Sequence, residues 1–154
     1  MATRGFEFAY MLDGSNATPL IRDFTLGAAA AHKVGDLMKQ QSDDGYIDQV
    51  TGSTTEVTCV MQEALAAADV TAGTTKGKAA IITRNQVWRC STDASTATTA
   101  IEGGIKIWDT VDCNTIDASD VTNGAMIVVD KSTTDDDGNL IGYVVFADTT
   151  YGNA

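Results

Sequence analysis

The sequence is short of the residue types from which most catalytic and metal centres are built. It contains one histidine, His32, and three widely spaced cysteines, Cys59, Cys90 and Cys113, with no CxxC pair. A multi-histidine metal centre, a histidine-based catalytic dyad, a zinc site and a disulfide framework are therefore not expected. We expect His32 to be solvated in a surface loop, and the cysteines to act as small buried hydrophobes in a reducing compartment.

Basic residues are also scarce. The chain has 10 Lys and Arg against 21 Asp and Glu, which gives a net charge of −11 and a pI near 4.2. Binding to nucleic acid or to anionic lipid relies on positive side chains. We therefore expect no nucleic-acid partner, no membrane partner and an exterior that faces water. The chain also lacks an apolar run suited to a signal peptide or a membrane span, so we expect synthesis in the cytoplasm.

Proline and aromatic residues are few, whereas small and β-prone residues are common. There is one proline, aromatics make up 6% of the chain, and the hydrophobic fraction of 44% is ordinary for a globular protein. A length of 154 residues fits one domain with a real core. Short β-prone runs recur between turn clusters along the chain. This spacing predicts an all-β fold, a small β-barrel or β-sandwich of short, mostly antiparallel strands.

The stretch Lys76–Cys90 is the centre of this interpretation. An apolar run, Ala79–Ile82, is separated by a polar break from the alternating run Gln86–Cys90. Two such runs around an Asn-containing break predict a hairpin. The first run is apolar on both faces, so it belongs inside a closed or two-layered sheet. A second strand–turn–strand unit is expected over residues 34–50, around Asp44-Gly45.

Residues 1–26 differ from the rest and are expected to form an extended N-terminal arm, with residues 27–154 as the β-barrel domain. Phe6, Phe8 and Tyr10 alternate with other residues, which predicts a short strand with one aromatic face. An arm with few local partners packs on its own domain or reaches a neighbouring chain. We favour the second alternative.

Two acidic clusters invite a calcium interpretation, Asp43–Gly45 and Asp135–Asn139. An EF-hand loop needs glycine at its sixth position and glutamate at its twelfth, and neither cluster satisfies both conditions. Turns between strands are the simpler interpretation, and a looser metal site at Asp135–Asn139 stays open. No nucleotide-binding or serine-hydrolase motif occurs. We predict no catalytic residue, no cofactor, no metal and no small-molecule substrate, with Trp88 and Trp108 in a core or an interface.

The order of the segments resembles the small β-barrel decoration proteins of tailed bacteriophages, which are also called head-stabilising or cement proteins. The resemblance covers residues 34–147 and consists of strand and turn patterns without an invariant chemical motif. An early strand and a following Asp-Gly-Tyr turn carry its first part, and an alanine-rich segment, an apolar pair of strands and two C-terminal strands carry the rest. The residues concerned are Val34–Leu37, Asp44–Tyr46, Met61–Ala68, Lys78–Trp88, Gly124–Asp130 and Gly142–Phe146.

The resemblance implies a non-enzymatic virion protein on the outer capsid surface, with the major capsid protein as partner and a homotrimer as its assembly. One alternative is a tail or head-fibre component with the same fold. Another is a small enzyme or sugar-binding module that uses Trp88, Trp108 and the Asp clusters. For the contact with the capsid or a sister subunit we predict Phe6, Phe8, Tyr10 and Leu20, because aromatic anchors tend to carry interface energy. On this hypothesis, deletion of residues 1–20 abolishes capsid binding and leaves the domain folded.

Overall fold

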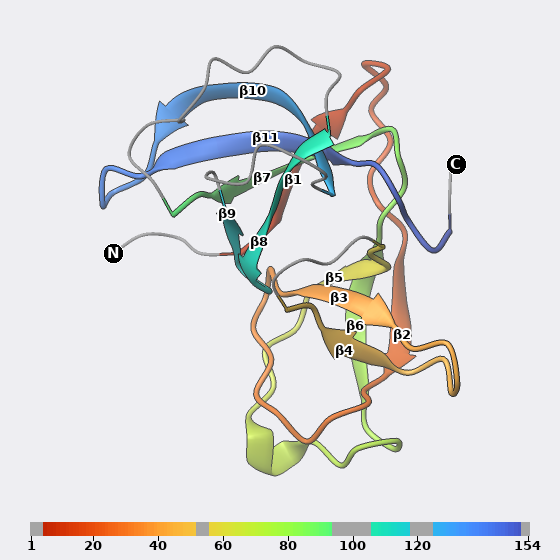
Figure 1. Cartoon of the computed structure of the whole chain (residues 1–154). Coiled ribbons are helices and arrows are strands. Elements are labelled where there is room, and N and C mark those ends of the chain that lie inside the picture. The colour runs from red at the N-terminus through yellow and green to blue at the C-terminus, as the bar shows by residue number, and fades with distance from the viewer. Residues whose placement is uncertain (1–4, 52–55, 94–105, 118–124, 152–154) are drawn as a thin grey trace.

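The structure is a computed structural model that describes residues 5–51, 56–93, 106–117 and 125–151. As the sequence predicts, the fold is all-β (Figure 1). Apart from one short 3-10 helix (Ala67–Asp69), the regular elements in these ranges are strands. They are β1 (Glu7–Met11), β2 (Ile21–Thr25), β3 (Leu37–Gln40), β4 (Ile47–Gln49), β5 (Cys59–Met61), β6 (Lys76–Ile81), β7 (Gln86–Ser91), β8 (Lys106–Asp112), β9 (Thr115–Asp117), β10 (Met126–Thr134) and β11 (Leu140–Phe146).

The strands form two antiparallel sheets. A six-stranded sheet has the order β1-β7-β11-β10-β8-β9, and a five-stranded sheet has the order β2-β6-β5-β3-β4. The six-stranded sheet occupies the upper part of Figure 1 and the five-stranded sheet the lower part. The sheets do not close into one barrel. Of the two architectures predicted, the observed one is sandwich-like.

Apolar side chains pack on both faces of the five-stranded sheet. One face joins the main core around Trp88 and Phe146, to which the sheet contributes Leu37, Val60 and Ala80, and Ile82, directly after β6, joins the same core. The other face forms a second cluster that includes Met38, Cys59, Met61, Ala79 and Ile81. The run Ala79–Ile82 thus alternates between two cores, which confirms the prediction that it lies inside a layered structure.

The predicted hairpin over Lys76–Cys90 is wrong, although both of its strands exist. β6 pairs with β2 and β5, whereas β7 pairs with β1 and β11, so the chain changes sheet between them. The buried amide of Gln86 holds this corner. Its oxygen accepts hydrogen bonds from the Thr83 N–H (3.0 Å) and the Trp88 indole (3.2 Å), and its nitrogen donates to the Ile81 carbonyl (3.2 Å). A side chain therefore replaces the ladder that a hairpin would have formed.

The strand–turn–strand unit predicted over residues 34–50 is confirmed as β3 and β4. The Asp44 carboxylate accepts a hydrogen bond from the Tyr46 N–H (2.8 Å), and Gly45 has a positive φ of 76°. Asp and Gly are the residue types that such a turn requires.

The segment expected to be an extended arm contributes strands to both sheets of its own chain. β1 is the end strand of the six-stranded sheet and pairs with β7, and β2 is the end strand of the five-stranded sheet and pairs with β6. The N-terminal segment therefore runs along the edge of one sheet and then of the other; in Figure 1 β1 rises from the middle of the upper part, and the chain then descends on the right-hand side to β2.

Candidate interaction surface

The four residues predicted to contact another chain divide into two pairs. Phe6 is only 2% exposed and packs on Phe146, and Phe8 lies edge-on against Trp88, with 5.7 Å between the ring centroids. Both rings are thus engaged within this chain. Tyr10 is 44% exposed and Leu20 is 65% exposed, so these two residues are available to a partner.

A β-bulge explains why the alternation of the aromatic residues is misleading. The register between β1 and β7 shifts between Phe8 and Tyr10. A bulge inserts one residue and reverses which side chains face the core. As a result Met11 is buried and Tyr10 is exposed, although the sequence places Tyr10 in phase with Phe6 and Phe8.

We call the exposed apolar residues of this region the N-terminal strip, namely Tyr10, Leu12, Leu20 and Ile21. Leu12 and Ile21, which the sequence analysis missed, are both more than half exposed. Main-chain hydrogen bonds place Leu12 and Leu20 next to the corner between β6 and β7. The Leu12 N–H donates to the Asn85 carbonyl (2.7 Å), and the Ile81 N–H donates to the Leu20 carbonyl (2.8 Å). Apolar residues on both sides of the Asp13–Asn16 turn cluster were the available signal in the sequence.

The segment that carries the strip is itself acidic, with one Arg against three Asp and Glu. The strands beside it, β6 and β7, lie in residues 76–91, which hold four Lys and Arg and no acid, so the two regions together are less acidic than the rest of the chain. Residues 5–26 and 76–91 hold five Lys and Arg against three Asp and Glu, whereas the remaining residues hold five against eighteen. Exposed ion pairs lie here, Lys78 with Asp23 (3.2 Å), Arg84 with Asp148 (3.8 Å) and Arg89 with Glu7 (2.9 Å). The hydrogen bonds that Arg89 donates to Glu7 and then Tyr143 raise the pKa of Arg89, which keeps this guanidinium charged. An apolar strip on a nearly neutral face suits contact with another protein.

His32 is buried, so the expectation of a solvated histidine is wrong. It is 2% exposed, and its main chain forms a two-way hydrogen-bonded bridge with Leu65 (2.8 and 2.9 Å). This bridge joins the loop after β2 to the segment after β5. It is a contact between distant residues, for which the sequence carries no local pattern. Within the described part of the chain, neither ring nitrogen has a hydrogen-bond partner. An imidazole without an acceptor or donor nearby is not arranged as a catalytic base.

The structure also bears on the alternative chemical roles. Trp88 is fully buried, so it cannot serve as a stacking platform for a sugar, and the side chain of Trp108 lies outside the described residues. No group of three or more His, Cys, Asp or Glu side chains that could hold a metal ion occurs among the residues that the structure describes. In the Asp135–Asn139 turn, one oxygen of Asp135 accepts from the N–H groups of Asp137 and Asn139, both at 2.9 Å.

The cysteines that the structure describes are free thiols. Cys59 and Cys90 are buried and Cys113 is half-buried, as expected for small hydrophobes. Burial raises the pKa of Cys59, and burial together with Asp36 and Asp112 raises the pKa of Cys113 to about 12. These two groups remain thiols at neutral pH, which is unlike an activated nucleophile.

A hollow of about 180 Å³ lies beside the start of β1. Its charged lining residues are Glu7, Arg89, Asp135 and Asp136. The guanidinium in it is already paired with Glu7, and its one thiol, Cys90, is buried. The hollow is therefore a surface depression whose guanidinium is already ion-paired.

Comparisons with protein-family models, with curated proteins and with solved structures gave no match for this chain. Among the described residues, no helix is long and apolar enough to cross a membrane.

Proposed function

We propose that this chain is a non-enzymatic virion protein that decorates the outer surface of a phage capsid. In this role it binds the major capsid protein as a homotrimer and stabilises contacts between capsid subunits. Many copies bound across subunit boundaries stabilise the assembled shell by mass action. A chain with a net charge of −11 suits the outer face of a shell, away from packaged DNA.

The observation that carries this proposal is the N-terminal strip. Three leucine and isoleucine side chains and one tyrosine are exposed on the N-terminal segment of an otherwise acidic protein. Apolar and aromatic side chains of this kind are typical of the centre of a protein–protein interface. The resemblance in segment order supplies the kind of partner.

The proposal predicts that Leu20→Ser weakens binding to undecorated expanded heads. Leu20 is 65% exposed, so its truncation should change the free energy of unfolding by no more than about 0.5 kcal/mol. If the Leu20 side chain is buried against the capsid, its replacement by serine should weaken binding about tenfold. Co-sedimentation of purified protein with heads, as a function of concentration, measures the change.

Val34→Ser is the matched control, because Val34 is also exposed but lies outside the strip. It should bind like the unchanged protein. Equal loss in both variants would show that the strip is not the contact. Failure of the unchanged protein to bind heads would contradict the proposal itself. Binding of a few copies at the vertices or the tail would favour the head-fibre or tail alternative.

A further inference from the structure

The free side of β2 can be identified from the hydrogen-bond alternation. The Ile81 N–H donates to the Leu20 carbonyl and the Leu26 N–H donates to the Thr75 carbonyl, at 2.8 and 2.9 Å. The register between these two bonds is regular from Ile21↔Ala80 to Thr25↔Lys76. In an antiparallel ladder, main-chain groups of alternate residues point to the same neighbour. Residues 20, 22, 24 and 26 therefore face β6, and the main-chain groups of Ile21, Asp23 and Thr25 face away from it.

Within the described ranges, no strand ladder pairs with the outward side of β2, but an isolated parallel bridge joins Leu26 to Ile47 of β4, where the Gly27 N–H donates to the Ile47 carbonyl (3.0 Å). Such a bridge also engages the carbonyl side of Thr25, so the uncovered part of the edge is Ile21 to Asp23. Each of the other end strands has a main-chain contact at, or directly before, one of its residues. Phe6 donates to Gly35 beside β1 (2.8 Å), and Ile116 of β9 accepts from Asp93 (3.0 Å). The first three residues of β2 are exposed, so the open edge is accessible.

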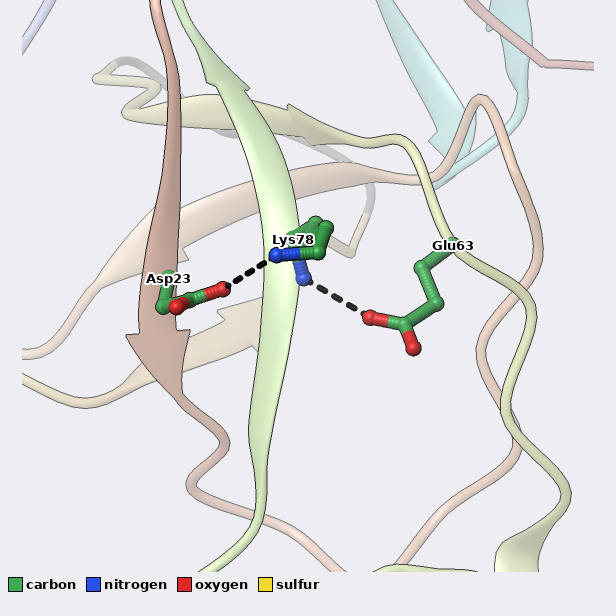
Figure 2. Close-up of polar contacts among 3 residues, drawn as sticks. All are labelled: Asp23, Glu63 and Lys78. Atoms are coloured by element: carbon green, nitrogen blue, oxygen red, sulfur yellow. Dashed lines mark hydrogen bonds and ion pairs between the residues drawn. The ribbon is translucent and has the colours of Figure 1, made fainter.

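The lower part of Figure 1 shows β2 at the side of the molecule, and Figure 2 shows how its bonded side is held. The Lys78 ammonium reaches Asp23 (3.2 Å), and the Lys78 N–H donates to the Glu63 carboxylate (3.0 Å). Both side chains of the ion pair are more than half exposed, so it contributes little to stability. The strand is thus fixed on β6, while on its other side the main-chain groups of Ile21 and Asp23 have no partner among the described residues.

The charges on β2 oppose pairing with a second copy. An antiparallel copy must place outward residues opposite one another. A two-fold axis at Asp23 sets the two Asp23 side chains face to face, and an axis at Arg22 does the same for the two Arg22 side chains. An axis at Phe24 or Thr25 needs the Gly27 N–H, which Ile47 already uses, and an axis at Ile21 needs an N–H from Pro19, which proline lacks. Like charges directly opposite are destabilising, and edge strands use them against self-association.

We propose that the edge of β2 binds an extended segment of a different protein, which adds a sixth strand to the five-stranded sheet. In the antiparallel orientation of this sheet, the added strand places four residues opposite Phe24, Asp23, Arg22 and Ile21 in turn. Complementarity requires an apolar residue, a basic residue, an acidic residue and an apolar residue in that order. This inference is independent of the capsid proposal, because it names the chemistry of the bound strand and no particular partner.

The first test is amide hydrogen exchange in the free protein, followed by NMR. The N–H groups of Arg22 and Phe24 should exchange at least about tenfold more slowly than those of Ile21, Asp23 and Thr25. Equal protection of all five would show that the edge is already covered and would overturn the proposal.

The second test uses a capped hexapeptide with the core Val-Lys-Glu-Val between two threonines. At millimolar concentration it should shift and protect the amides of Ile21, Asp23 and Thr25. A peptide of the same composition with the core Lys-Val-Val-Glu keeps the net charge but loses both charge pairs, and it should bind about tenfold more weakly. Absence of any shift, or equal binding of the two peptides, would refute the proposal.

A pair of variants tests the main-chain contact. Asp23→Pro removes an outward N–H that the fold does not use, and proline is tolerated at such edge positions. Asp23→Ala removes the same ion pair with Lys78 but keeps the N–H. The proline variant should bind the first peptide about tenfold more weakly than the alanine variant, with its remaining amide spectrum unchanged. Equal binding by the two variants would contradict strand addition.

Discussion

At the scale of single residues, burial decides what each unusual side chain can do. Gln86, His32 and the cysteines are polar or reactive residue types, yet they lie in the interior or half within it. Gln86 uses its amide to satisfy the main chain at the corner between the sheets. The thiols Cys59 and Cys113 are kept protonated by their surroundings, because burial disfavours the thiolate.

This leads to a prediction for thiol chemistry. The pKa of Cys113 is raised from 9.0 to about 12, so alkylation by iodoacetamide at pH 8 should be at least about tenfold slower in the native protein than in urea. The folded state also holds this proton more tightly than the unfolded state. Its contribution to stability is therefore full below about pH 9 and declines as the pH rises above it. Mass spectrometry of timed samples measures the rate, and a native rate equal to the unfolded rate would contradict the burial of this thiol.

At the scale of elements, the N-terminal segment is the part whose role the structure changes most. The sequence predicts an extended arm over residues 1–26, and on that interpretation deletion of residues 1–20 leaves the domain folded. In the structure, Phe6 lies in the main core, Met11 is buried and β1 completes the six-stranded sheet. Removal of the N-terminal segment should therefore disturb the core as well as any contact with a partner.

Deletion of residues 1–20 should lower the free energy of unfolding by about 3 kcal/mol or more, the usual cost of removing one buried phenylalanine. Urea denaturation followed by tryptophan fluorescence measures it, because Trp88 contacts Phe8. Deletion of residues 1–4, which ends before the core residue Phe6, is the control. An unchanged midpoint after the longer deletion would restore the interpretation as a separate arm.

At the scale of the whole molecule, charge and assembly are linked. Each copy carries a charge of −11, so copies repel one another except where the nearly neutral face with the N-terminal strip is presented. Added salt screens this repulsion within about 10 Å at 0.1 M. Association between copies should therefore be favoured by moderate salt.

Light scattering of the purified protein is expected to give a trimer of the 16.1 kDa chain. EDTA should leave the mass unchanged, because no metal-binding cluster occurs in the described residues. A stable monomer at all salt concentrations would contradict the solution trimer, and addition of undecorated heads would then test whether trimers form only on the capsid. Dissociation by EDTA would instead point to a metal site such as the Asp135–Asn139 turn.

Local chemistry in the sequence determined the fold class, the doubly apolar run Ala79–Ile82, the Asp44-Gly45 turn and the scarcity of groups for catalysis. These features depend on alternation and turn preferences, which neighbouring residues specify by themselves. Only the tertiary structure decided that β6 and β7 belong to different sheets, that His32 is buried and that the bulge in β1 turns Tyr10 outward. Each of these depends on contacts between residues far apart in the chain, for which a single sequence carries no local signal.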